Sequence, residues 1–286
     1  MKLVLPGAAI GLLGGGENAR LFASAARRMG YRVHVYAPDS DAVARLAGDT
    51  AMQRPFDDLI SVREFASRVE VVTVVSGDVP AETMLAAADV TLLRPSASVF
   101  EAAVNSTAEF TVVGARGAGG ECVFYRPVAN DYVEGILDVA RSPASLNGEM
   151  TRQAVATTRD LFGKLDLIGV ACVGFSMTPD QELVMGGVFP YPHASGLLTI
   201  DACVTSQFEQ HLRAVCGLPL GSAEMLKPAA TAMLRDELSG EPDWVAAYAL
   251  PAVKLHRGHV TATAASATLA KQIVLTARSL LTSHHE

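Results

Sequence analysis

The stretch GLLGGGENARLFASAARRMGYRVHVYAPD, residues 11–39, decides the fold. A short apolar strand at residues 8–13 enters three glycines, and apolar residues at helical spacing then continue to Gly30, a typical helix-stop residue. The three glycines are Gly14, Gly15 and Gly16. Residues 31–37 form a second apolar strand. This order of strand, glycine turn, helix and strand predicts a parallel, Rossmann-like β/α layer.

The same pattern continues to about residue 97. Ser61, with Glu64 three residues later, is typical of a capping box that opens a helix. Buried strands are expected at residues 70–75 and 89–93, and a helix is expected to begin at Pro80. We therefore expect a first domain of residues 1–97.

Residues 98–286 have a different periodicity, which predicts an α+β domain. Hairpins are expected at residues 109–128 and 167–189, because alternating or apolar runs there flank turn residues. Helices are expected at residues 148–164, as one long element at 200–217, and from about residue 266. A last strand is expected at residues 259–264.

Composition limits the function classes. Hydrophobic residues make up 50% of the chain and charged residues 19%, which excludes a disordered chain or a coiled coil. A net charge of -7 disfavours nucleic acid and anionic lipid as partners. No run is apolar over the ~20 residues that a membrane helix needs. The four cysteines lack CxxC spacing, so free thiols and a cytoplasmic location are expected.

Two local motifs have both a functional and a structural interpretation. Gly14-x-Gly16-x-x-Ala19 with Asp39 has the spacing of a dinucleotide site, but Glu17 opposes a phosphate at that helix start. The segment FPYPHASG, residues 189–196, contains His193 and Ser195, which suit acid-base or nucleophilic chemistry. A simpler explanation of the first motif is that its glycines allow close packing. A simpler explanation of the second is that His193 bonds to backbone groups of its own turn. No histidine or cysteine spacing indicates a zinc site.

The opening stretch resembles the PurK family, 5-(carboxyamino)imidazole ribonucleotide synthase, and TIDACVTSQFEQHLRAVCGLPLGS, residues 199–222, resembles that family's most distinctive C-terminal stretch. The resemblance implies an ATP-grasp fold: a pre-ATP-grasp domain, a lid and a C-terminal domain. It also implies a homodimer that carboxylates aminoimidazole ribonucleotide with bicarbonate while cleaving ATP with magnesium.

The chain departs from this family where the lid and the metal site are expected. Barely a dozen residues separate Ser96 from Glu109, where a family member would run through the lid. Gly174 and Gly187 stand where the resemblance predicts two magnesium-binding glutamates, and Gly186 replaces a neighbouring asparagine. We therefore expect a lid-less chain with no metal site and no ATP or magnesium as cofactor.

Positions that the resemblance assigns to the substrate have changed as well. The family's PRPHNSGH reads PYPHASGL at residues 190–197, and its acidic EFEN string reads VSGD at residues 75–78. Ala129 and Tyr132 replace a glutamate and a histidine, whereas Asn130 between them is kept. The basic hairpin after residues 254–256 is shortened to Arg257, Gly258 and His259, which removes much of the expected phosphate site.

These departures leave three functional hypotheses. The first is a non-catalytic PurK-like paralogue that binds a nucleotide-like small molecule or a purine-pathway protein. The second is an ATP-independent enzyme acting on an imidazole or other ribonucleotide, and the third is residual carboxylation. The catalytic candidates are His193, Ser195 and His256. The ligand-binding candidates are Gly14, Gly15, Gly16, Glu17, Arg20, Arg116, Asn130, His193, Ser195 and Lys254.

Overall fold

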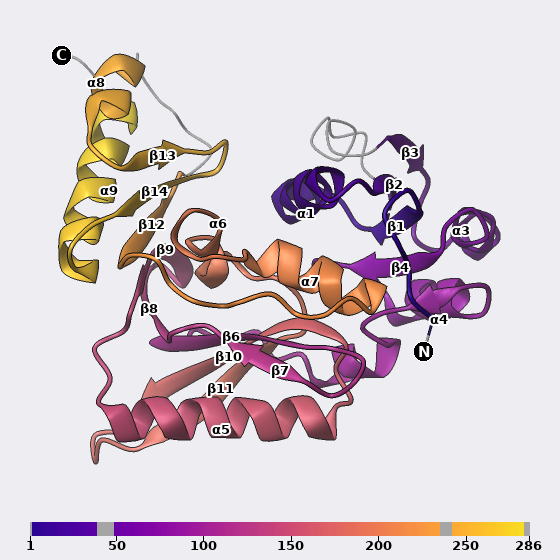
Figure 1. Ribbon diagram of the computed structural model, residues 1–286, viewed down its shortest axis with the longest axis horizontal. Helices are drawn as coiled ribbons and strands as arrows, with labels where there is room; N and C mark the ends of the chain where they lie inside the picture. The colour runs from indigo at the N-terminus through magenta and orange to yellow at the C-terminus, as the bar shows by residue number, and fades with distance from the viewer. Residues whose placement is uncertain (1, 39–48, 235–241, 283–286) are drawn as a thin grey trace.

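The computed structural model describes residues 2–38, 49–234 and 242–282. Within these ranges the strands form a five-stranded sheet near the N-terminus and a nine-stranded sheet from the rest of the chain (Figure 1). The first sheet is parallel and the second antiparallel, which confirms the expected fold class. None of the helices in these ranges has the length and apolar character needed to cross a membrane.

The five-stranded sheet has the order β3-β2-β1-β4-β5. Its strands are β1 (Ala9–Leu13), β2 (Arg32–Ala37), β3 (Thr50–Gln53), β4 (Val71–Val74) and β5 (Leu92–Leu93). Its helices are α1 (Gly16–Arg28), α3 (Leu59–Ala66) and α4 (Ala81–Ala88). The short helix η1 (Ala97–Ala102) follows β5. β1 and β4 are fully buried, because helices cover both faces of the sheet.

The helix cap expected at Ser61 is wrong: the cap is Asp58, three residues earlier. Helix α3 begins at Leu59, and the Asp58 carboxylate is its cap, accepting the Ser61 N–H at 3.1 Å. The Ser61 hydroxyl donates to the same carboxylate at 2.7 Å. An aspartate cap accepts the free amides of the first turn as well as serine does, and here it lies three residues earlier.

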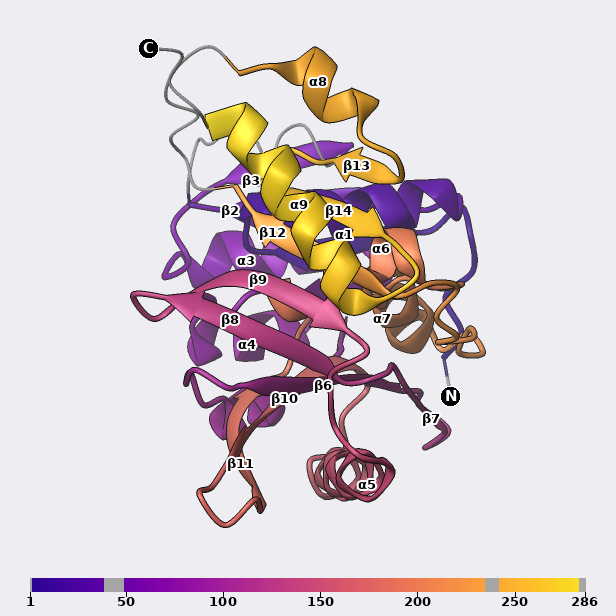
Figure 2. The same cartoon turned by 90° about the vertical axis from the view of Figure 1, so that its left-hand side faces the viewer.

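The nine-stranded sheet has the order β11-β10-β6-β8-β9-β12-β14-β13, with β7 paired to β6. Its strands are β6 (Phe110–Arg116), β7 (Cys122–Phe124), β8 (Val128–Val133), β9 (Ile136–Ser142), β10 (Gly169–Met177), β11 (Leu183–Phe189), β12 (Ala229–Met233), β13 (Val253–Leu255) and β14 (His259–Thr263). Helix α5 (Gly148–Lys164) packs Phe162 against Val112 and Val173, while α9 (Ala267–Thr282) covers β12 and β14 (Figure 2). The short α8 (Trp244–Ala249) lies against α9.

The single long helix expected at residues 200–217 is wrong. The segment forms α6 (Thr199–Ala202), an extended turn, and α7 (Gln207–Cys216). Cys203 leaves the helix to form a bridge with Met225, and the Ser206 hydroxyl then caps α7 by accepting the Glu209 N–H at 3.2 Å. Gly217 ends α7 in the left-handed conformation, as expected for a helix-stop glycine.

Helix α7 lies between the two sheets (Figure 1) and joins them through His211. The His211 Nδ1 accepts the Val170 N–H of β10 at 3.0 Å. The other ring nitrogen, Nε2, therefore carries the hydrogen and donates it to the Thr73 hydroxyl of β4 at 2.8 Å. This fully buried histidine fixes the relative position of the sheets around the candidate site.

Candidate functional site

The glycine turn between β1 and α1 adopts the conformation that its sequence requires. Gly14 (φ +98) and Gly16 (φ +84) are both left-handed, and the Gly14 N–H donates to the Tyr36 carbonyl at 2.9 Å. At the start of α1, the Asn18 amide donates to the Val75 carbonyl at 3.1 Å and to the Pro192 carbonyl at 2.9 Å. The turn is thereby tied to the segment that carries His193.

The start of α1 carries a carboxylate as well as a cation. Arg20 Nε donates to the Glu17 carboxylate at 2.8 Å, and this hydrogen bond raises the pKa of Arg20. Glu17 therefore compensates the nearest cation and places negative charge beside the helix N-terminus, which disfavours a dinucleotide pyrophosphate there. Asp39, the other half of the dinucleotide motif, lies outside the described residues.

Tyr191 occupies space at the carboxyl end of β4, where open α/β sheets usually bind ligands. A Cβ at Gly77 would lie 2.9 Å from the Tyr191 hydroxyl, so the ring covers this glycine. Tyr191 also stacks on Phe100 and meets Phe189 edge-on, with ring centroids 6.3 Å apart in both pairs. An aromatic ring thus stands where the resemblance predicts a substrate-binding arginine.

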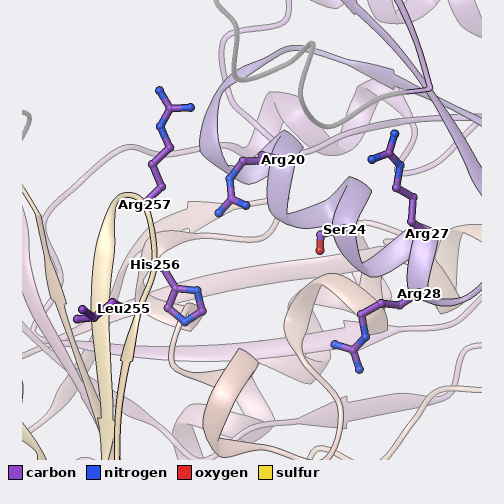
Figure 3. A pocket seen from close by; sticks show the side chains of 7 residues that line it. All are labelled: Arg20, Ser24, Arg27, Arg28, Leu255, His256 and Arg257. Carbon is purple, nitrogen blue, oxygen red and sulfur yellow. The ribbon is translucent and has the colours of Figure 1, made fainter. Parts of the chain in front are cut away.

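A cavity of about 640 Å³ lies between α1 and the β13–β14 hairpin (Figure 3). On the helix side, four residues at positions i, i+4, i+7 and i+8 present one polar face: Arg20, Ser24, Arg27 and Arg28. On the hairpin side the lining consists of Leu255, His256 and Arg257. We call this the arginine cavity. Its lining has no acidic side chain, although Glu17 reaches Arg20 from beside it.

Two stacked histidines support the hairpin wall of the arginine cavity. The His256 Nε2 lies 2.8 Å from the Asp201 carboxylate, and its ring stacks on His259 at 4.3 Å. His259 is fully buried, and neither of its ring nitrogens has a hydrogen-bond partner among the residues described. Burial, followed by the nearby His256 and Arg20, lowers the pKa of His259 to about 3. The hairpin wall therefore holds a neutral histidine beneath a cationic rim.

Three predicted site residues, Asn130, His193 and Ser195, are brought together at η2 (Ala194–Gly196). The Asn130 amide donates to the Thr111 hydroxyl at 2.7 Å, which donates to the Ser195 hydroxyl at 3.4 Å. Ser195 Oγ lies 3.1 Å from the His193 Nδ1, which also accepts the Ser195 N–H at 3.3 Å. Ser195 is fully buried, and burial lowers the pKa of His193 to about 4. Burial therefore keeps the His193 ring neutral near pH 7, and the hydrogen bonds to Ser195 fix its orientation.

Residues 103–109, which we call the strap, connect η1 directly to β6 and lie across β10 and β11. Val104 exchanges two backbone hydrogen bonds of 3.0 Å with Val188. Farther along, Cβ atoms built at Gly186 and Gly187 would each lie 3.3 Å from the Ser106 hydroxyl. The strap therefore packs on the strand surface that these glycines leave free of side chains.

The two glycines expected in place of metal-binding glutamates are neighbours. A Cβ at Gly174 would lie 3.3 Å from the Gly187 backbone nitrogen, and 2.6 Å from the Ala108 Cβ of the strap. Within the described ranges, no group of three or more histidine, cysteine, aspartate or glutamate side chains could hold a metal ion. Magnesium prefers carboxylate and other oxygen ligands, and this donor set does not fit it.

Comparison with known families finds two overlapping domain matches. The ribonucleotide synthetase preATP-grasp domain matches residues 8–104, and the ATP-grasp domain matches residues 73–208. N5-carboxyaminoimidazole ribonucleotide synthase from Bacillus subtilis (strain 168) is 24% identical over 307 residues, covering 79% of this chain and 81% of that protein. The chain belongs to the PurK family of ATP-grasp proteins.

Other PurK relatives agree with this assignment. The synthase from Brucella melitensis is 24% identical and covers 77% of this chain and 83% of that protein. The crystal structure of the ADP complex of purK superposes with a TM-score of 0.88 at 22% identity, covering 97% of this chain and 98% of that one. The synthetase from Thermus thermophilus gives a TM-score of 0.87 at 24% identity, covering 96% and 99%. The solved PurK structures share the fold of this chain.

The alignment with the Bacillus PurK relative contains many positions that have no counterpart in this chain. The alignment covers 79% of the 286 residues of this chain, which is about 226 residues, but it is 307 positions long. About 80 positions of the alignment therefore have no residue of this chain. The strap is the short connection from η1 to β6, where the sequence predicts that the lid of the family is missing.

Two predicted site residues lie away from both clusters. Arg116, at the end of β6, donates to the Asp166 carboxylate at 2.8 Å and to the Leu167 carbonyl at 2.9 Å, which ties down the end of α5. Lys254 is exposed on β13 and does not line the arginine cavity. Their roles in ligand binding remain predictions.

Sequence reasoning missed five of the seven residues that line the arginine cavity: Ser24, Arg27, Arg28, Leu255 and Arg257. It also missed Asp201, which lies against His256 outside the lining. The helical spacing from Arg20 to Arg28 was a usable signal, because it places one polar stripe on a single face of α1. The hairpin that faces this stripe could not be anticipated, since it meets α1 only in the folded chain.

Proposed function

We propose that this PurK-family chain binds a phosphorylated small molecule and does not carry out the ATP-dependent carboxylation of aminoimidazole ribonucleotide. The observation that carries this proposal is the contact of the strap with Gly174 and Gly187. Both positions lack the carboxylates that magnesium would need, and the strap uses the space that longer side chains would require.

Phosphoryl transfer depends on cationic and backbone donors around the transferred phosphate. In ATP-grasp enzymes, as the resemblance implies, the lid supplies a large share of them. The strap has no lysine or arginine and runs directly from η1 to β6. A chain built in this way has little means of orienting ATP or of neutralising the charge that develops as its phosphate is transferred.

The arginine cavity is the better candidate for a ligand. Arginine forks bind phosphate oxygens strongly, and the cavity is lined by Arg28 on the α1 side and by Arg257 on the hairpin side. The names of the PurK relatives include a ribonucleotide, so a phosphoribosyl compound is the chemical class that we propose for this chain. Its phosphate would lie between α1 and the β13–β14 hairpin.

An ATP-independent enzyme is the second hypothesis, and the His193 cluster is the observation in its favour. Ser195 donates to a neutral His193, an arrangement found at nucleophilic serines. Full burial of Ser195 argues against that role, because a nucleophile must reach its substrate. A histidine whose pKa is lowered to about 4 is also a weak base near neutral pH.

The remaining proposals concern assembly and location. The four cysteines are unpaired, which fits the reducing cytoplasm that we propose. We also propose a homodimer, on the resemblance alone, and leave open a purine-pathway protein as an additional partner. Analytical ultracentrifugation at several protein concentrations tests the dimer directly.

Calorimetric titration with ribose 5-phosphate, aminoimidazole ribonucleotide and unphosphorylated ribose tests the ligand proposal. We expect saturable binding of the two phosphorylated compounds and none of ribose. Arg28→Ala and Arg257→Ala should each weaken binding at least about tenfold, because each removes a charge-assisted hydrogen bond. Arg152→Ala, an exposed substitution on α5, is the matched control. Equal binding by the pocket variants and the control would contradict the proposal.

A further inference from the structure

A groove lies between the edge strand β7 and the extended segment of residues 222–225, which follows α7. Its volume is about 540 Å³, and it shares no lining residue with the arginine cavity. β7 lies at the margin of the nine-stranded sheet, where β6 is its one strand neighbour among the described residues (Figure 2). We call this the β7 groove. One side of β7 is therefore an unpaired sheet edge that borders a groove.

The pairing of β7 with β6 shows which backbone groups of β7 point outward. The Glu121 carbonyl and the Tyr125 N–H, on either side of β7, bond to β6 or to the residue just after it, both at 2.9 Å. Backbone groups of successive residues in a strand point to opposite sides, and this ladder has no shift of register. The N–H and carbonyl groups of Cys122 and Phe124 therefore point away from β6. No described residue forms a backbone hydrogen bond with these four groups.

The other wall of the groove has a second free edge. Met225 forms an isolated bridge with Cys203, and the residues that flank Met225 make the hydrogen bonds of this bridge. The Glu224 carbonyl accepts at 2.9 Å and the Leu226 N–H donates at 2.8 Å, both toward residues 202–204. By the same alternation, the N–H and carbonyl of Met225 point away from residues 202–204, and neither is bonded within the described part of the chain. Two extended edges with free backbone groups thus border one groove.

Free N–H and carbonyl groups on both walls favour an occupant that is itself an extended backbone. A peptide that is added as a strand donates to the carbonyls and accepts from the N–H groups of the edge it joins. An inorganic anion would bond to the N–H groups but not to the carbonyls, and an apolar molecule would bond to neither. The backbone chemistry of the β7 groove therefore selects a peptide.

The floor of the β7 groove is apolar, and its lining includes charges of both signs. Val123, Ala223 and Met225 are half-buried and pack on the hydrophobic core beneath them. Arg126 and Glu224 are exposed at the groove, and neither forms an ion pair with another described residue. Opposite charges that face each other across neighbouring strands stabilise the pairing. A strand with an apolar side chain between a basic and an acidic one complements this surface.

We propose that the β7 groove binds an extended peptide segment of a partner protein, which adds a strand to β7. An acidic side chain of the peptide pairs with Arg126, a basic one pairs with Glu224, and an apolar one between them lies on Val123. The groove is separate from the arginine cavity, so this inference holds whether or not that cavity binds a phosphorylated ligand.

Selection from a phage-displayed library of random decapeptides on the immobilised full chain tests this proposal. Enriched peptides should have β-branched or aromatic residues between a basic and an acidic residue, without proline in that core. The affinity of the synthetic, labelled peptides should fall at least about tenfold for Arg126→Glu/Glu224→Lys, which reverses both charges at constant net charge. Fluorescence anisotropy measures this affinity. Arg152→Glu/Asp160→Lys, which exchanges two exposed charges on α5, is the matched control and should bind as the wild type does.

A backbone variant tests the added strand itself. Cys122→Pro removes one outward N–H of β7 and no bond to β6, so it should weaken peptide binding by about two- to tenfold. Cys122→Ala keeps the N–H and should bind normally, and circular dichroism verifies that each variant folds.

Three results would overturn the proposal. The first is no enrichment of peptides above an uncoated support. The second is equal affinity of the enriched peptides for the wild type and for the charge-reversed variant. The third is self-association in sedimentation that the charge reversal at Arg126 and Glu224 abolishes, because a second copy of the chain would then occupy the groove.

Discussion

Ala108 of the strap packs directly on Gly174 of β10, so closely that a Cβ at position 174 would lie 2.6 Å from the Ala108 Cβ. Real Cβ atoms are not found this close together, and any side chain at Gly174 would therefore displace the strap. Glycine at this position and the short connection from η1 to β6 are thus structurally dependent on each other.

We expect Gly174→Ala to destabilise the chain by about 1 to 3 kcal/mol, the usual cost of forcing an extra carbon into a packed position. Urea unfolding measures this free energy. Gly163→Ala, in helix α5, is the matched control, because no atom lies within 4 Å of the added methyl group. The control should be neutral or stabilising by up to about 1 kcal/mol, since alanine favours helices. Wild-type stability of Gly174→Ala would show that the strap does not pack as described.

The buried histidines predict sensitivity to acid. Burial lowers the pKa of His211 to about 3 and that of His193 to about 4, against 6.5 for an unperturbed histidine. The unfolded chain binds these protons more readily than the folded one. Stability should therefore be constant above about pH 6.5 and fall as the pH is lowered toward 4, by up to about 1.4 kcal/mol per unit for each histidine. Urea midpoints at pH 7.5, 6.0 and 5.0 measure this dependence.

His259 provides a variant that separates this effect from general acid sensitivity. It is buried with a pKa lowered to about 3, and its nitrogens have no partner in the described part of the chain. His259→Leu should therefore reduce the loss of stability between pH 6.5 and 5.0 while retaining the fold at pH 7.5. An unchanged pH profile would contradict the assignment of this histidine as neutral and buried.

Replacing Glu17 should change the affinity for a phosphorylated ligand in the opposite direction to replacing the arginines of the cavity. Its carboxylate is bonded to Arg20, so it places a negative charge beside the arginine cavity. Glu17→Gln should tighten binding of ribose 5-phosphate by about two- to fivefold at low salt, with a smaller gain at 0.5 M salt because surface charges are screened. Glu64→Gln, which breaks the exposed pair with Arg68, is the control and should leave affinity unchanged. Weaker binding by Glu17→Gln would mean that Glu17 contacts the ligand.

The break between α6 and α7 depends on Ser206. Its hydroxyl caps α7, and replacing a serine cap by alanine typically costs about 1 kcal/mol. Ser206→Ala should lower the free energy of unfolding by that amount in a urea titration. Ser279→Ala on α9 removes a hydroxyl within a helix and should be neutral or slightly stabilising. Equal stability of the two variants would argue against a cap at Ser206.

Local signals predicted much of this fold. Apolar runs and glycine turns correctly gave β1, β4, the β6–β7 and β10–β11 hairpins, and α5. These local signals failed where contacts between segments distant in the sequence determine the secondary structure. The segment from residue 200 to 217 has helical spacing throughout, but Cys203 forms a strand bridge with Met225 and interrupts the helix. Strands β8, β9 and β12 were not predicted, because their short segments lack clear alternation and become strands by pairing with distant neighbours.

The candidate site was predictable only in part, for a similar reason. The resemblance identified Asn130, His193 and Ser195, and the structure joins them by hydrogen bonds through Thr111. It could not reveal how the strap crosses β10 and β11, since those contacts form only in the folded chain. The presence of Arg28 and Arg257 in the lining of one cavity likewise depends on how the β13–β14 hairpin approaches α1.

The most direct measurement is ADP release by the purified chain supplied with aminoimidazole ribonucleotide, bicarbonate, magnesium and ATP. The Bacillus subtilis synthase serves as the positive control under identical conditions. The account predicts no release above a protein-free blank from this chain, together with saturable binding of aminoimidazole ribonucleotide in the same buffer. Release that requires aminoimidazole ribonucleotide and persists through repurification would contradict it, because a chain with glycine at positions 174 and 187 and only the short strap between η1 and β6 would then still orient and cleave ATP.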